Sequence, residues 1–83
     1  MGHPLGRTPA QLERLFDEAQ LLHDRLLRVT RALTVTQDFI AETCERLAGA
    51  GGDNARHRQL EAERARAFAE ECRRFAARLD ELG

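Results

Sequence analysis

Apolar residues from Leu12 to Leu47 recur alternately three and four positions apart, the spacing that places side chains on one face of a helix. In a seven-residue repeat labelled a to g they occupy positions a and d over five heptads, and the opposite f positions are all charged. This pattern predicts one long amphipathic helix over about residues 9–48. The a/d stripe consists of Leu12, Leu15, Ala19, Leu22, Leu26, Val29, Leu33, Thr36, Ile40, Thr43 and Leu47, and the f positions are Asp17, Asp24, Arg31, Asp38 and Glu45.

Both ends of this helix are marked in the sequence. Thr8 can cap it, Pro9 suits its first position, and Gln11 can complete a capping box. The glycine-rich segment 49–54 contains the only internal helix-breaking cluster and predicts a chain reversal. Asp53 is the expected cap of a second helix over about residues 54–82.

The second helix has a weaker stripe with the same spacing. Because a single glycine-rich turn separates two amphipathic helices, the sequence predicts one all-α domain over residues 1–83, an antiparallel, coiled-coil-like helical hairpin. The β-branched residues between Val29 and Thr36 lower helix propensity locally, and a break there would give a three-helix bundle instead. The second stripe consists of Ala65, Phe68, Cys72, Phe75, Leu79 and Leu82, flanked by Leu60, Ala69 and Ala76.

The stripe of the first helix is too wide and too long for one partner helix. Apolar residues such as Phe16, Val35 and Phe39 widen it, and a shorter second helix would end opposite about residue 20. We therefore expect self-association into a homodimeric four-helix bundle, or contact with another helical protein. The expected interface consists of Leu12, Leu15, Phe16, Ala19, Leu22, Leu26, Val29 and Leu33.

Composition narrows the classes of partner. The 83 residues carry 13 basic and 14 acidic side chains, so the net charge of −1 favours neither nucleic acid nor a membrane surface. All basic residues are arginines, which with abundant Ala and Leu indicates a GC-rich bacterial genome. The start of the chain lacks the features of a secretory signal, and the two cysteines suit a reducing compartment, so we expect a cytoplasmic protein.

The two cysteines are expected to stay apart. With a turn centred near residue 51, Cys44 faces Arg58 and Cys72 faces Thr30, which separates the thiols by about 20 Å along the hairpin. A disulfide requires Cα atoms within about 7 Å, so no intrachain bond is expected. Cys72 lies on the apolar stripe and is expected to be buried, whereas Cys44 at its edge is a candidate reactive thiol.

A metal site has few candidate ligands. Cys44, His57 and Glu61 can approach one another near the turn, but a structural zinc ion normally takes four ligands and no ligand-pair motif accompanies them. We therefore expect no metal and no other cofactor.

Polar residues close to the stripe suggest a ligand pocket as an alternative. His23, Thr36, Gln37 and Thr43 could line a polar cavity inside a dimeric bundle. The threonines could instead bond to the carbonyl four residues back. Neighbouring acidic residues diverge around a helix, and the sequence holds no activated nucleophile, so an enzyme is not expected.

These features favour a helical protein-interaction or regulatory module that acts by self-association or by binding a partner helix. The alternative from another functional class is a sensor of a small ligand, a metal or a thiol reagent, with its site inside a dimeric bundle.

Overall fold

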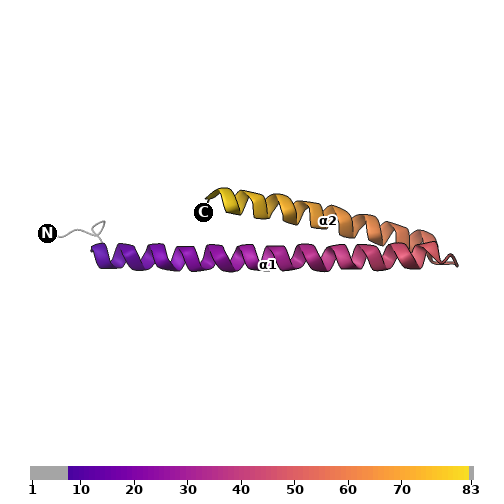
Figure 1. The fold of residues 1–83 in the computed structure, drawn as a ribbon, viewed down its shortest axis with the longest axis horizontal. Coiled ribbons are helices and arrows are strands. Elements are labelled where there is room, and N and C mark those ends of the chain that lie inside the picture. The colour runs from indigo at the N-terminus through magenta and orange to yellow at the C-terminus, as the bar shows by residue number, and fades with distance from the viewer. Residues whose placement is uncertain (1–7, 83) are drawn as a thin grey trace.

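The computed structural model describes residues 8–82, which form two antiparallel α-helices joined by a short turn (Figure 1). Helix α1 spans Pro9–Gly49 and helix α2 spans Ala55–Leu82. The expected all-α hairpin is confirmed. Helix α1 runs without interruption through the β-branched segment 29–36, so the three-helix alternative is wrong.

The start of α1 is the expected capping box. The Gln11 amide donates to Thr8 Oγ1 at 3.1 Å, and the Thr8 amide donates to Gln11 Oε1 at 2.9 Å. Pro9 occupies the first turn, where the amide that proline lacks would have no partner inside the helix. The first helix therefore begins where the sequence predicts it.

The turn depends on two glycines with positive φ. Gly51 has φ 82° and Gly52 has φ 95°, values that other residues rarely adopt. Helix α2 begins at Ala55, and the Arg58 amide donates to the Asn54 carbonyl at 2.9 Å. Asn54 therefore precedes the first helical residue, in the position that we had expected for Asp53.

The joint between the helices is lined by small and polar residues. Every α1 residue on this joint follows a residue of the predicted a/d stripe by one position, a rotation of about 100° around the helix. Ala41 and Cys44 are buried there. We call these residues the α1 seam: His23, Leu27, Thr30, Thr34, Gln37, Ala41, Cys44 and Ala48.

The facing residues of α2 are also small. Its buried residues are four alanines, one cysteine and one leucine, alternately three and four positions apart. Small side chains let two helices approach closely, so α2 packs by this row rather than by its larger residues. Phe68, Phe75 and Leu82 of the predicted stripe are instead exposed. The α2 seam consists of Ala62, Ala65, Ala69, Cys72, Ala76 and Leu79.

The threonines of α1 are accommodated by hydrogen bonds along the helix. Thr30 Oγ1 donates to the Leu26 carbonyl at 2.7 Å, and Thr34 Oγ1 donates to the Thr30 carbonyl at 3.0 Å. Thr30 is thereby buried without losing its hydrogen-bond partner. This bonding explains why the β-branched segment remains helical within the hairpin.

The two helices differ in length, at 41 and 28 residues. Near the end of α2, His23 Nε2 contacts the Leu79 carbonyl oxygen, so α1 residues before about 21 extend beyond their partner (Figure 1). We call residues 9–21 the overhang. Neither helix contains an apolar segment long enough to cross a membrane within the described range.

Candidate interaction surface

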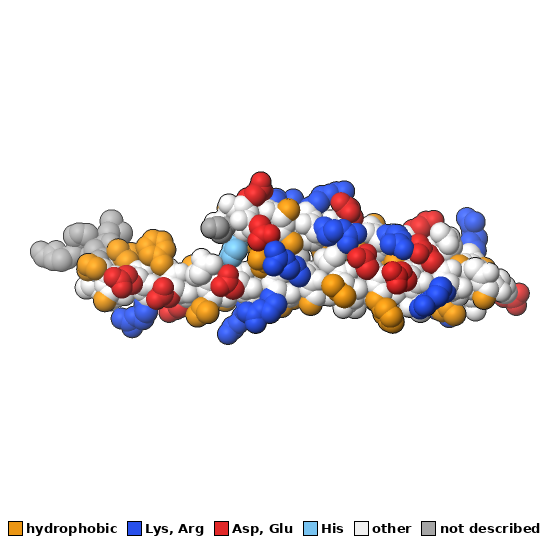
Figure 2. Space-filling view, in the orientation of Figure 1, with side chains coloured by type: hydrophobic (Ala, Val, Ile, Leu, Met, Phe, Trp, Pro, Cys, Tyr) orange, Lys and Arg blue, Asp and Glu red, His pale blue; other side chains and the backbone are white. Residues whose placement is uncertain are grey.

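One flank of the joint is closed by three ion pairs in regular sequence. Arg31 binds Asp80 at 2.9 Å, and the next two pairs follow at seven-residue steps along both helices. The seven-residue spacing results from the heptad geometry, which returns each f position of α1 to the same side of α2. Acidic and basic side chains alternate along this junction in Figure 2. The other two pairs are Asp38–Arg73 at 2.9 Å and Glu45–Arg66 at 2.6 Å.

The Glu45–Arg66 pair has the most complete geometry. Arg66 Nε donates to Glu45 Oε2 at 2.8 Å while Nη2 donates to Oε1 at 2.6 Å. This two-point hydrogen bond lowers the pKa of Glu45 and raises the pKa of Arg66. Both side chains are partly exposed, at 39% and 48%, so the pair orients the helices more than it stabilises them.

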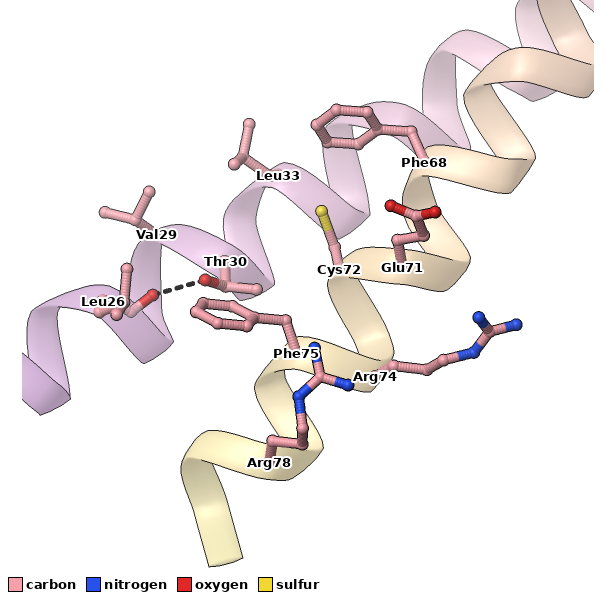
Figure 3. A pocket seen from close by; sticks show the side chains of 10 residues that line it. All are labelled: Leu26, Val29, Thr30, Leu33, Phe68, Glu71, Cys72, Arg74, Phe75 and Arg78. Atoms are coloured by element: carbon pink, nitrogen blue, oxygen red, sulfur yellow. Dashed lines mark hydrogen bonds between the residues drawn. The ribbon is translucent and has the colours of Figure 1, made fainter. Parts of the chain in front are cut away.

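The opposite flank is apolar and contains an open groove of about 580 Å³. Leu26, Val29 and Leu33 of α1 form one wall, while Phe68 and Phe75 of α2 form the other (Figure 3). In the close-up these side chains stand on the same side of the joint. The seam residues Thr30 and Cys72 also line the groove.

Charged residues of α2 border this groove. Glu71, Arg74 and Arg78 contribute to its lining, and the Arg78 guanidinium lies 5.8 Å from the centre of the Phe75 ring. A guanidinium at this distance interacts favourably with an aromatic face. The site is thus an apolar strip with a mainly basic rim.

The groove is part of a longer apolar surface. Leu22, Leu26, Val29 and Leu33 are between 40% and 63% exposed, although they are the regular a/d residues of α1. At the overhang, Figure 2 also shows apolar side chains that α2 does not reach. We call the following set the apolar face: Leu12, Leu15, Leu22, Leu26, Val29, Leu33, Ile40 and Leu47 of α1, with Phe68 and Phe75 of α2.

All eight residues of the expected interface are exposed in the hairpin. Phe16, at 72% exposure, continues the line of the α1 seam into the overhang. Leu12, Leu15 and Ala19 lie in the overhang with it, and the other four belong to the part of α1 that α2 accompanies. The hairpin leaves this surface available, and its use as an interface stays a prediction.

The four residues of the expected polar pocket are not brought together at the groove. His23 and Gln37 are half-buried in the seam, whereas Thr36 is exposed and Thr43 accepts a hydrogen bond from Arg46 at 3.4 Å. The groove of the single chain is lined by other residues. A polar cavity formed with a second chain stays a prediction.

Glu61 connects the three candidate metal ligands. Its carboxylate accepts a weak hydrogen bond from the Cys44 thiol at 3.9 Å and contacts His57 Nε2 at 2.6 Å. Within residues 8–82, however, no three His, Cys, Asp or Glu side chains converge in a geometry that could hold a metal ion. In this arrangement Glu61 accepts from the Cys44 thiol and lies beside the His57 imidazole one helical turn earlier.

Both cysteines are free and buried, with 5% exposure for Cys44 and 8% for Cys72. Burial of Cys72 agrees with its expected place on a stripe. Cys44 lies within the seam rather than at its edge, because the packed row is rotated by one residue from the predicted stripe. Its exposure is too low for ready reaction with reagents in solution.

Three comparisons, with family models, with curated proteins and with solved structures, returned no match to this chain. Function is therefore inferred from its surface alone.

The sequence pattern did not identify the two phenylalanines of the groove as part of a binding site. Phe68 and Phe75 were assigned to the packed stripe of α2, although their seven-residue spacing also fits a separate row. The competing row of alanines at positions 62, 65, 69 and 76 was the available signal, because close helix packing favours small residues.

Proposed function

We propose that this protein is a helical interaction module whose apolar face binds a helical partner, either a second copy or another protein. The role is binding rather than catalysis. An apolar strip suits an amphipathic helix, and the net charge of −1 favours neither a nucleic acid nor a membrane surface. Both cysteines are free, in keeping with a cytoplasmic location.

The observation that supports this proposal most directly is that small residues are buried between the helices while large apolar residues are exposed. Leu79 is the only large side chain among the buried residues of the described chain. The leucines and phenylalanines that would form a core are instead exposed, and each gains about 1.5–3 kcal/mol when buried. A contiguous exposed surface of this type is typical of a protein-binding site.

Site-specific photo-crosslinking can test this function in the source cells. A photoreactive residue at Leu22 lies on the apolar face, whereas the same residue at Glu63 lies on the exposed surface of α2. We expect a discrete polypeptide adduct from position 22 that is absent from position 63. Equal adduct patterns from the two positions would contradict the proposal.

The groove supports a second candidate function, the binding of a small ligand. Its volume of about 580 Å³ lies within the usual range for ligand sites, and its lining combines apolar side chains with the Arg78 guanidinium. An apolar anion would fit this chemistry. Isothermal titration with a medium-chain fatty acid separates the candidates, because saturable 1:1 binding that Phe75→Ala abolishes would favour the sensor.

A further inference from the structure

We propose that the occupant of the apolar face is a second copy of this chain, with its α1 packed antiparallel against the first α1. The inference rests on the proposed function and specifies its partner. It follows from the length of the helices, the spacing of the apolar face, the charges beside it and the surface area of the single chain.

The unequal helix lengths favour an antiparallel copy. Helix α1 exceeds α2 by 13 residues, which leaves about 20 Å of helix without a partner in the hairpin. A copy that runs in the opposite direction brings the turn end of its own hairpin beside this overhang. Each hairpin thereby covers the end that the other leaves open, and all four helices overlap in the middle.

The a and d residues of α1 are self-complementary about a two-fold axis at the level of Arg31. This axis places Leu22 opposite Ile40 of the second copy and Val29 opposite Leu33 of the second copy, because antiparallel helices pair a with d positions. Leu15 meets Leu47 of the second copy in the same register. The groove is then filled by the same leucine and valine residues that line it.

Charges beside the apolar face select this register. The axis at Arg31 brings Glu18 next to Arg46 of the second copy, and the symmetry forms this pair twice. A shift of the pairing by one heptad in either direction would remove the Glu18–Arg46 pair, and in one of the two directions it would place Arg25 against Arg46 of the second copy. Opposite charges at flanking positions specify helix orientation in this way.

The single chain exposes more surface than a folded monomer of its mass is expected to expose. The chain exposes 6696 Å², whereas a folded monomer of 9.4 kDa is expected to expose about 5,000 Å². The excess of about 1,700 Å² exceeds the roughly 800 Å² that each partner buries in a standard interface. A second copy therefore accounts for surface that a hairpin alone leaves exposed.

Sedimentation equilibrium of the full chain, combined with charge reversal, tests the proposal. We expect twice the monomer mass of 9.4 kDa at micromolar concentration. Glu18→Arg and Arg46→Glu should each weaken dimerisation by about three- to tenfold, because each places two like-charge pairs in the interface. The double variant E18R/R46E should restore the affinity, and Glu63→Arg, on the exposed surface of α2, should leave it unchanged.

The outcomes separate this inference from the proposed function. A monomer that retains its helicity by circular dichroism would overturn the second copy as occupant, while a crosslink from position 22 to another polypeptide would still support an interaction module. A dimer that the double variant does not restore would overturn the antiparallel register. Circular dichroism of each variant distinguishes a weakened dimer from a misfolded chain.

Discussion

The two flanks of the helix joint use opposite chemistry. On one flank, Arg31, Asp38 and Glu45 reach across to charged residues of α2, and their ion pairs are complete within a single chain. On the other, Leu26, Leu33 and the phenylalanines of α2 form a surface that remains open. The charged flank therefore forms its contacts within the hairpin, whereas the apolar flank stays exposed.

The same contrast exists around α1. Its seam of small and polar residues holds α2 close, while the larger a/d residues one position earlier point away from the joint. A helix with two adjacent heptad rows can pack against two neighbours at once, as in a four-helix bundle. The single chain thus packs by the row of smaller residues and leaves the row of larger residues exposed.

The largest expected effect comes from a charge on the apolar face. Leu22→Asp should dissociate the assembly and lower helicity, because each copy loses an apolar contact worth about 1.5–3 kcal/mol and buries a carboxylate. Light scattering and circular dichroism report the two changes. Leu60→Asp is the matched control, since Leu60 is exposed at 45% on the outer side of α2. Equal behaviour of the two variants would show that the two surfaces are equivalent.

A second prediction concerns the seam. Ala69 is fully buried between the helices, so Ala69→Leu should force them apart and destabilise the fold by about 1–3 kcal/mol. Ala67→Leu adds the same atoms at an exposed position of α2 and should have little effect. Urea unfolding measures both variants. If Ala69→Leu is as stable as Ala67→Leu, the alanine row is not the closely packed joint.

The outline of the fold was predictable because its signals are local. The capping box at Thr8, the glycines of the turn and the heptad spacing each fix a helix or its end through neighbouring residues. The rotation of the seam was not predictable from one helix, because the choice between adjacent rows depends on which row of α2 allows closer approach. The assignment of Phe68 and Phe75 to the core failed for this reason, whereas the exposure of the overhang follows from helix lengths alone.

The burial of the thiols gives a third prediction. Cys44 and Cys72 should react with a thiol reagent only when the joint opens, so the labelling rate of both should rise together in mild denaturant. Mass spectrometry after partial labelling checks this. Ready labelling of Cys72 alone under native conditions would show that the groove side of the joint is open and has no cover.

The smallest expected effect is on the charged flank. The hydrogen bonds from Arg66 lower the pKa of Glu45 below its usual value of 4.5, so the folded state favours the carboxylate. The stabilisation is present above the unfolded pKa and is lost as the pH falls through the folded value. Glu45→Gln removes this titration, and its unfolding midpoint in urea should fall less steeply on acidification than that of the native chain. Glu63→Gln, on the exposed surface of α2, is the control and should follow the native profile.

At neutral pH, Glu45→Gln should lower the free energy of unfolding by less than Ala69→Leu does, because exposed ion pairs contribute little. A larger loss for Glu45→Gln would mean that the charged flank, and not the alanine seam, holds the hairpin together.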